Sequence, residues 1–341
     1  MIDVAAGTDL TGATVLVTGA DGFIGSHVVE HVLAHGGTVR AFCLYNSRSS
    51  LGWLDESETF AAALRSGRAE VVLGDIRDAE HVQSAVHGVD LVLHLAALIA
   101  IPHSYVAPRS YVDTNVTGTL NVLEAVRRHG TARMVNTSTS EVYGTPESVP
   151  IREDHALRGQ SPYSATKIAA DKLCESYALS FGTPVVTLRP FNTYGPRQSA
   201  RAVIPTVLSQ LLAGAEELRL GAVTPQRDFT FVTDTALGFV RASVADLEPG
   251  EVVQLGTGRT VSIAEVVEIC KQVTGNDAEV VTEEDRVRPT GSEVEILLSD
   301  PSRASAVLDW RPAVTLEDGL KATADWLRGR VALESAARYQ R

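Results

Sequence analysis

Tyr163 and Lys167 lie four residues apart, directly after Pro162, and this spacing could support base catalysis on an alcohol. Pro162 suits the first turn of a helix, because its missing N–H would have no partner there anyway. On such a helix the phenol and the ammonium share one face. A phenol ionises near pH ~10, and an adjacent ammonium lowers its pKa by favouring the phenolate. The pair therefore predicts a base, although the same spacing also occurs by chance on many amphipathic helices.

A hydroxyl-rich segment upstream of this helix is the second candidate for chemistry. The apolar run Met134–Ser138 has the character of a strand, and it continues into Thr139, Ser140 and Glu141. Hydroxyls and a carboxylate at the end of a strand could share protons with a substrate. The simpler interpretation is that Glu141 only fixes a loop.

A glycine-rich motif near the N-terminus predicts a dinucleotide site. The strand-like run Thr14–Thr18 precedes a helix expected over Ser26–His35, and the loop between them contains Gly19, Gly22, Phe23, Ile24 and Gly25. The first glycine permits a tight turn, the second lets the backbone approach a pyrophosphate, and the third allows close packing of helix on strand. The helix N-terminus offers N–H groups to the anion. Outside this strand–loop–helix setting the three glycines would be a weak signal.

The end of the next strand bears on the choice between NAD and NADP. An acid there would bind the adenosine ribose 2′-hydroxyl of NAD. The strand Thr38–Leu44 is followed instead by Asn46 and Arg48, whose guanidinium could receive a 2′-phosphate. This loop favours NADP; the alternative is that Arg48 is a solvated loop residue.

Two later strands place more residues at the same edge. Ala69–Leu73 precedes Asp75 and Ile76. The Asp75 carboxylate could accept a hydrogen bond from an adenine amine or cap the following helix. Val89–Ala96 runs into Ala96 and Ala97, small residues that would let a cofactor lie against the backbone, and Leu95 before them is a further cofactor-binding candidate.

Strands and helices alternate along the first half of the chain, which predicts an α/β fold with a doubly wound parallel sheet of the Rossmann type. Long helices are expected over Tyr105–His129, which contains Asn115, and over Ser161–Phe181. We predict a dinucleotide-binding domain over 1–190, to which part of 228–258 returns. A smaller, mixed α/β lobe over 191–341 would bind the substrate. Ligands of such sheets bind beyond the carboxyl ends of the strands.

Composition restricts the partners and the compartment. A net charge of -12 argues against a surface for nucleic acid or an anionic membrane. The three cysteines, Cys43, Cys174 and Cys270, are far apart in apolar contexts and indicate free thiols, not a disulfide or metal site. No apolar run approaches the roughly 18 residues of a membrane span, and the N-terminus has no signal-peptide pattern. We expect a cytoplasmic protein without a metal.

Together these motifs resemble the extended short-chain dehydrogenase/reductase family, specifically its NAD(P)-dependent sugar-nucleotide epimerases and dehydratases. The resemblance covers essentially the whole chain, on Thr18–Gly25, Asp75–Arg77, His94–Ala97, Asn115, Ser138, Tyr163, Lys167, Arg189–Pro196, Arg227–Asp234 and Arg288–Pro289. It implies tightly bound NAD or NADP. By analogy it also implies a homodimer formed through the helices Tyr105–His129 and Ser161–Phe181.

The resemblance implies roles for the catalytic candidates. Tyr163 would deprotonate the sugar 4-hydroxyl while a hydride leaves C4 for the nicotinamide. Lys167 would lower the phenol pKa and hold the nicotinamide ribose. The hydroxyl of Thr139 or of Ser138 would share the proton with the substrate oxygen.

The resemblance also implies a set of substrate ligands. Asn192, Arg227 and Arg288 match positions that hold the pyrophosphate of the sugar nucleotide in relatives. Arginine suits this role because its guanidinium is a planar fork of donors. A surface ion pair is the alternative for each arginine.

The pair Ser140 and Glu141 bears on which reaction follows. In 4,6-dehydratases of this family the corresponding pair is Asp-Glu: Glu removes the C5 proton, Asp protonates the departing C6 hydroxyl, and the hydride returns to C6. Here Glu141 keeps the base, but a serine hydroxyl is a poor proton donor without a relay. A Ser-Glu pair also occurs in relatives that decarboxylate UDP-glucuronate.

Two stretches favour the dehydratase. Asn46–Asp55 and Arg197–Pro205, which includes the candidate substrate ligand Arg201, resemble bacterial dehydratases of N-acetylglucosamine nucleotides that carry Ser-Glu. We therefore predict a 4,6-dehydratase of a nucleotide hexose, an N-acetylated hexose being one candidate. UDP-sugar 4-epimerase and UDP-glucuronate decarboxylase are the alternatives, with UDP, GDP and dTDP all open as the nucleotide. A non-catalytic dinucleotide-binding regulator is disfavoured because it needs neither Tyr163 nor Glu141.

Overall fold

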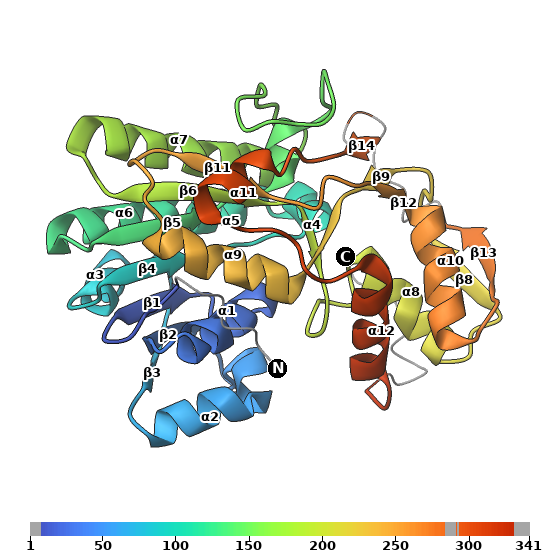
Figure 1. The fold of residues 1–341 in the computed structure, drawn as a ribbon, viewed down its shortest axis with the longest axis horizontal. Helices are drawn as coiled ribbons and strands as arrows, with labels where there is room; N and C mark the ends of the chain where they lie inside the picture. Colours follow the sequence, from blue (N-terminus) through green and yellow to red (C-terminus); the bar gives the residue numbers. More distant parts are fainter. Residues whose placement is uncertain (1–7, 284–290, 292, 331–341) are drawn as a thin grey trace.

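A seven-stranded parallel sheet forms the centre of the computed structural model, which describes residues 8–283, 291 and 293–330 (Figure 1). Its strands are β1 (Thr14–Thr18), β2 (Thr38–Leu44), β3 (Ala69–Gly74), β4 (Leu91–His94), β5 (Arg133–Thr137), β6 (Val185–Pro190) and β11 (Val252–Leu255). Their order is β11-β6-β5-β4-β1-β2-β3, so the strand order reverses between β1 and β4. A crevice for a ligand is expected beyond the carboxyl ends of these two strands.

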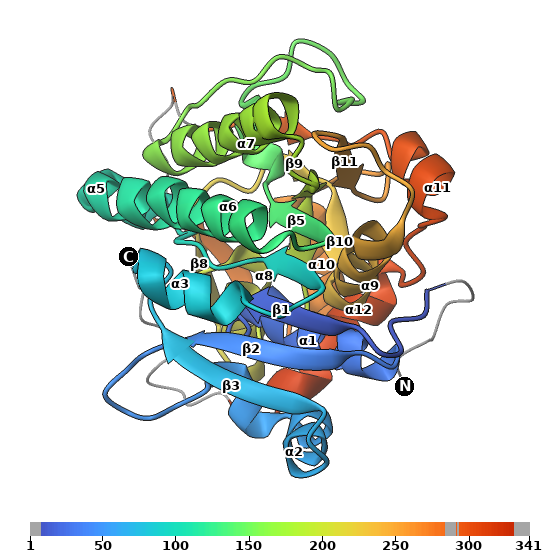
Figure 2. The same cartoon turned by 90° about the vertical axis from the view of Figure 1, so that its left-hand side faces the viewer.

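Helices cover both faces of the sheet, which explains why its inner strands are apolar on both sides. Figure 2 shows α3 (Ala79–Val86), α6 (Gly118–His129) and α7 (Pro162–Phe181) on one face, and α1 (Phe23–Ala34) and α9 (Val232–Val244) on the other. Side chains of β1 alternate between two separate apolar clusters. Val15 and Val17 pack in the cluster with α1 and α9, whereas Leu16 packs in the cluster with α6 and α7.

The prediction of one continuous helix over Tyr105–His129 is wrong. The chain forms α4 (Ile101–Val106), α5 (Pro108–Tyr111), a π-helical turn η2 (Val112–Thr117) and then α6. Pro108 has no N–H to donate to the preceding turn, and Ala107 before it leaves the helical region with φ -127° and ψ 53°.

Shorter elements fill the rest of the chain. In the first half they are η1 (Gly52–Glu56), α2 (Glu58–Arg65) and η3 (Ser140–Tyr143). After β6 they are β7 (Asn192–Tyr194), α8 (Val203–Leu212), β8 (Glu217–Leu220), β9 (Gln226–Arg227), β10 (Phe229–Phe231), β12 (Val261–Ser262), α10 (Ile263–Thr274), β13 (Glu279–Thr282), β14 (Ile296–Leu297), α11 (Ser302–Leu308) and α12 (Leu316–Leu327). Helices α8, α10 and α12 share a separate apolar cluster around Leu208, Val266 and Leu320. The described residues contain no helix that is long and apolar enough to cross a membrane.

Asp228 joins the segments that follow β9, β11 and β14. Its carboxylate is fully buried and accepts hydrogen bonds from Thr257 N at 2.8 Å, Thr257 Oγ1 at 2.6 Å, Gly258 N at 3.0 Å and Ser299 Oγ at 2.5 Å. The carboxylate therefore connects strands that lie far apart in the sequence.

We expect Asp228→Ala to lower the free energy of unfolding by about 3 kcal/mol or more, because several buried donors lose their acceptor. Urea unfolding followed by tryptophan fluorescence would measure the change. Asp154→Ala, which alters an exposed loop carboxylate, is the matched control. Equal unfolding midpoints for the two variants would contradict this account.

Candidate active site

The glycine loop leaves room for an anion at the N-terminus of α1. A Cβ at Gly25 would lie 2.0 Å from the Gly19 carbonyl oxygen, and one at Gly19 would lie 2.9 Å from Ala96 Cα. Gly19 also has a φ of +67°, which favours glycine. Helix α1 begins at Phe23 with no acid in its first turn and no side-chain cap among the described residues, so its N–H groups can receive a phosphate. These features fit the pyrophosphate of a dinucleotide.

Thr18 and His94 join the carboxyl ends of β1 and β4 at the crevice. Thr18 Oγ1 lies 2.8 Å from His94 Nδ1 and accepts hydrogen bonds from the N–H groups of Leu95 and Ala96, at 3.1 Å each. Burial, and then the charge of Lys167, lower the pKa of His94 to about 3. His94 is therefore a neutral, structural residue; the sequence placed it in a family motif without assigning it a role.

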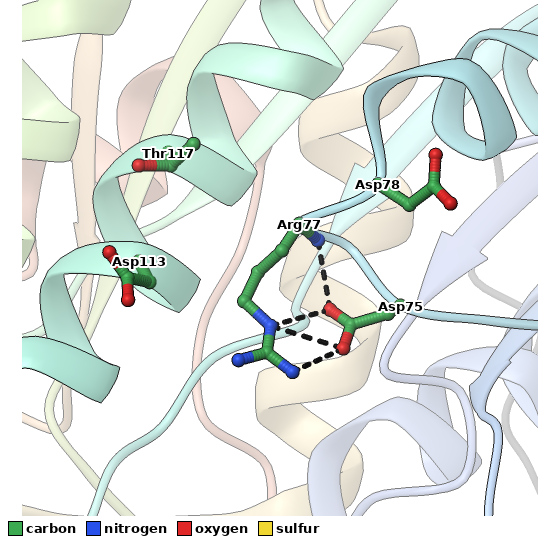
Figure 3. A pocket seen from close by; sticks show the side chains of 5 residues that line it. All are labelled: Asp75, Arg77, Asp78, Asp113 and Thr117. Carbon is green, nitrogen blue, oxygen red and sulfur yellow. Dashed lines mark hydrogen bonds and ion pairs between the residues drawn. The ribbon is translucent and has the colours of Figure 1, made fainter.

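A pocket of about 530 Å³ lies beside the end of β3, lined by Asp75, Arg77, Asp78, Asp113 and Thr117 (Figure 3). Arg77 Nε donates to the two carboxylate oxygens of Asp75 at 2.9 and 3.0 Å, and this pairing lowers the Asp75 pKa. The alternative that Asp75 caps the next helix is wrong, because Asp78 accepts from the first N–H groups of α3. Ile76 packs against Gly118 on α6 instead of facing this pocket.

The loop after β2 is built around Asn46. Asn46 Oδ1 accepts from the N–H groups of Arg48 at 3.1 Å and Ser50 at 3.3 Å, and its Nδ2 donates to the Ser50 carbonyl at 2.8 Å. The Arg48 side chain is exposed. Asp21, which we had not selected, reaches the end of β2, where its carboxylate accepts from Leu44 N at 3.4 Å.

Asn115 braces the loop after β4. Its Oδ1 accepts from Leu98 N at 2.8 Å, and its Nδ2 donates to Leu98 O and to Thr166 Oγ1, at 3.0 Å each. The residue therefore connects the π-helical turn with α7 and with the segment that continues from Ala96 and Ala97.

Tyr163 lies beside the hydroxyl-rich segment that follows β5. Tyr163 lies in the first turn of α7 and is 7% exposed. Burial raises the pKa of Tyr163, a hydrogen bond with Thr139 lowers it, and the negative charge of Glu141 raises it further. Thr139 therefore contacts the phenol, and Glu141 lies near enough for its charge to act on it.

Lys167 is buried one turn along the same helix. Its ammonium donates to the Thr137 carbonyl, and burial lowers its pKa while the charge of Asp171 raises it. The sequence predicted that Lys167 would lower the phenol pKa. In the structure the pKa of Tyr163 lies above its ordinary value, because burial outweighs the contact that lowers it.

Adjacent hydroxyls at the end of β5 have different partners. Ser138 Oγ donates to Asp171 at 2.7 Å and points into the core, whereas Thr139 reaches the phenol. Ser140 is buried at the start of η3, and Thr139 Oγ1 accepts from Glu141 N at 3.2 Å. The structure therefore selects Thr139 from the two hydroxyls that the sequence left open.

Three of the four candidate substrate ligands lie in the described part of the chain, each with different partners. Arg201 acts on Tyr111, whose pKa is raised by burial against the opposing charge of Arg201. The Tyr111 ring contacts the Tyr163 ring edge-on, with 6.3 Å between ring centroids. Arg227 is buried on β9 and donates to Glu293 at 2.9 Å, so it forms a buried ion pair and not a surface one. Asn192, on β7, donates through its side chain to the Asp228 carbonyl at 3.3 Å. Arg288 lies outside the described residues.

The glycine loop at the strand-order reversal and the buried Tyr–Lys helix define a Rossmann-fold protein of the short-chain dehydrogenase/reductase type. The family model for GDP-mannose 4,6 dehydratase matches residues 16–323, and the chain belongs to this family. The predicted family and fold class are thereby confirmed. The finer resemblance to dehydratases of N-acetylglucosamine nucleotides stays a prediction.

Individual relatives span nearly the whole chain. A dTDP-glucose 4,6-dehydratase from Streptomyces griseus is 36% identical over 312 residues, which cover 91% of this chain and 93% of the relative. A UDP-glucose 4-epimerase from Mycolicibacterium smegmatis is 33% identical over 321 residues, with coverages of 92% and 98%. A solved dTDP-glucose 4,6-dehydratase from Streptomyces venezuelae, with NAD bound, has a TM-score of 0.83 and 29% identity, and the match covers 92% of this chain and 97% of the relative.

Proposed function

We propose that this protein is a 4,6-dehydratase of a nucleotide hexose. The observation that carries the proposal is a buried phenol, that of Tyr163, which hydrogen-bonds with Thr139, and a carboxylate, that of Glu141, near enough for its charge to raise the phenol pKa. The first can take the proton of a sugar 4-hydroxyl and the second the proton at C5. The similarity to dTDP-glucose 4,6-dehydratases supports the same reaction.

The cofactor is a nicotinamide dinucleotide, which supplies a hydride acceptor when bound. The solved relative with NAD supports this assignment. The first turn of α1 and its glycine loop would hold the pyrophosphate, with Asp75 near the adenine and the small residues Ala96 and Ala97 against the rest of the molecule. Lys167 would hold the nicotinamide ribose.

We assign the two proton transfers to different residues, the first to Tyr163 with Thr139 and the second to Glu141. The hydrogen bond from Thr139 favours the phenolate of Tyr163, because it lowers a pKa that burial raises. No side-chain hydrogen bond to the Glu141 carboxylate occurs among the described residues, which leaves it available as a base. Arg201, Arg227 and Asn192 would bind the diphosphate of the substrate. For Arg227 this requires that it share its guanidinium with Glu293.

Incubation with UDP-, GDP- and dTDP-hexoses in deuterated water, followed by NMR, tests the function. Deuterium at C5 with a new C6 methyl group would identify a dehydratase. Inversion at C4 without label would identify an epimerase, and a pentose product a decarboxylase. No turnover and no transient reduced nicotinamide would indicate a regulator.

We infer a preference for NADP from the loop after β2. Residues 45–50 after the strand include no acid, although the Asp21 carboxylate reaches the strand end from the glycine loop, and Arg48 is exposed there. Arg48→Ala is expected to weaken NADP binding about tenfold and to leave NAD binding nearly unchanged, because the lost contact is to the 2′-phosphate. Titration of the cofactor-free protein with both nucleotides measures the effect, and Arg65→Ala on α2 is the control. Tighter binding of NAD by the unmodified protein would contradict this inference.

We also propose a homodimer formed through α6 and α7. Near the end of α7, Leu179 is 79% exposed and Phe181 is 55% exposed, which is consistent with an apolar contact surface. Light scattering would give the molar mass.

The free thiols Cys43, Cys174 and Cys270 fit the cytoplasm, where thiols stay reduced.

A further inference from the structure

A buried ion pair lies beneath the candidate site. Nε and Nη2 of Arg189 on β6 both lie 3.1 Å from Oδ2 of Asp171 on α7, and each residue is 4% exposed. The sequence assigned neither residue a role in the site, although Arg189 begins one of the motifs that carry the family resemblance. Buried charges cost free energy unless they are paired and hydrogen-bonded, so the partners of this pair indicate what it holds.

The carboxylate side of the pair contacts the end of β5. Asp171 Oδ2 accepts from Ser138 Oγ at 2.7 Å, and Ser138 precedes Thr139, whose hydroxyl meets the phenol. Asp171 also follows Lys167 by one helical turn on α7. One carboxylate thus connects the strand end of Thr139 with the helix of Tyr163.

The guanidinium side contacts the turn that carries Glu141. Arg189 Nη1 donates to the Tyr143 hydroxyl at 3.1 Å, and the guanidinium lies over the Tyr143 ring at 5.2 Å. Tyr143 ends η3, which begins with Ser140 and Glu141. The Tyr143 hydroxyl in turn donates to Gln254 Oε1 on β11 at 3.0 Å, which anchors the turn to the sheet.

We propose that Asp171 and Arg189 are positioning residues. Asp171 sets the Thr139 hydroxyl against the Tyr163–Lys167 helix, and Arg189, through Tyr143, sets Glu141 beside the substrate. The proposal rests on the proposed function, because it assigns one side of the pair to oxidation at C4 and the other to proton removal at C5. A misplacement of about 1 Å at either point is enough to slow a step strongly.

Asp171 also acts on the charge of Lys167. The groups that act electrostatically with this ammonium are Asp171 and Cys174 on α7 and His94 on β4. Asp171 raises the Lys167 pKa, whereas burial lowers it. Without the carboxylate, Lys167 should lose its proton at a lower pH.

The test uses three variants of the full chain and two readouts, transient reduced nicotinamide for C4 oxidation and deuterium at C5 for the later step. Tyr143→Phe should slow C5 labelling about tenfold or more and leave C4 oxidation nearly unchanged. Ser138→Ala should slow C4 oxidation instead. Asp171→Asn should slow C4 oxidation and move the alkaline limb of its pH profile to lower pH.

Tyr177→Phe is the matched control, because it removes a phenol hydroxyl from α7 that contacts Glu124 away from the site. Circular dichroism and bound cofactor report folding. If Asp171→Asn fails to fold, Tyr143→Phe and Ser138→Ala still decide the proposal. In Ser138→Ala the C5 labelling should slow together with the C4 oxidation that precedes it, whereas in Tyr143→Phe only the labelling should slow. Slowed C4 oxidation or normal C5 labelling in Tyr143→Phe, or normal C4 oxidation in Ser138→Ala, would overturn the proposal.

Failure of the positioning proposal can be told apart from failure of the proposed dehydratase function. If the unmodified protein gives no C5 label and no C6 methyl group with any sugar nucleotide, the dehydratase is excluded, and with it the role of Arg189 toward Glu141. The pH profile of C4 oxidation in Asp171→Asn then decides the remaining half. An unchanged alkaline limb would overturn that half as well.

Discussion

Tyr163→Phe is expected to reduce turnover by about 10²–10⁴-fold or more, while the protein stays folded and keeps its cofactor, because only the phenol oxygen is lost. The ring would keep its edge-on contact with Tyr111 and its place in the small cluster with Ile101. The variant should therefore fail at C4 oxidation itself, with no transient reduced nicotinamide on mixing with a sugar nucleotide.

Stopped-flow absorbance of reduced nicotinamide measures this step, with retained cofactor and circular dichroism as checks on the fold. Tyr177→Phe, on the same helix, should behave as the unmodified protein. Turnover by Tyr163→Phe near the normal rate would refute the role of the phenol and with it the proposed function.

Glu141→Gln is expected to stop the reaction after C4 oxidation. The amide has the shape of the carboxylate but cannot take the C5 proton, so product formation should fall about 10²–10⁴-fold. Reduced nicotinamide should then accumulate, and no deuterium should enter at C5. Glu147→Gln, in the exposed loop after η3, is the control.

Glu141→Gln should also change the pH dependence of the first step, C4 oxidation. The negative charge of Glu141 raises the pKa of Tyr163, so its removal lowers that pKa. A phenol with a lower pKa forms the phenolate at lower pH, and the acidic limb of C4 oxidation should move to lower pH. Normal turnover and an unmoved limb would together mean that Glu141 neither acts as the base nor faces the phenol.

Features that depend on local spacing could be predicted from the sequence. The strand, glycine loop and helix of 14–34 follow from apolar runs and from glycines where a Cβ would collide, and the structure has all three. The start of the helix of Tyr163 and Lys167 follows from Pro162, and the structure adds a capping box at Ser161. The interruption of the predicted helix at Pro108 also has a local cause, the proline itself. The π-helical turn after it depends on distant contacts, because Asn115 binds both Leu98 and Thr166.

The partner of each polar side chain was decided by the tertiary structure. Arg227 pairs with Glu293, which is 66 residues away in the sequence, and no local pattern encodes that contact. Likewise, no pattern near Asp171 indicates Arg189 on the neighbouring strand.

The sequence by itself determined the strand–glycine loop–helix segment and the placement of Tyr163 and Lys167 on one helix, because each depends on residues within a few positions of one another. Only the tertiary structure decided that Thr139 and not Ser138 meets that phenol. Consecutive side chains in an extended segment point to opposite sides, and the buried Asp171–Arg189 pair takes the hydroxyl of Ser138.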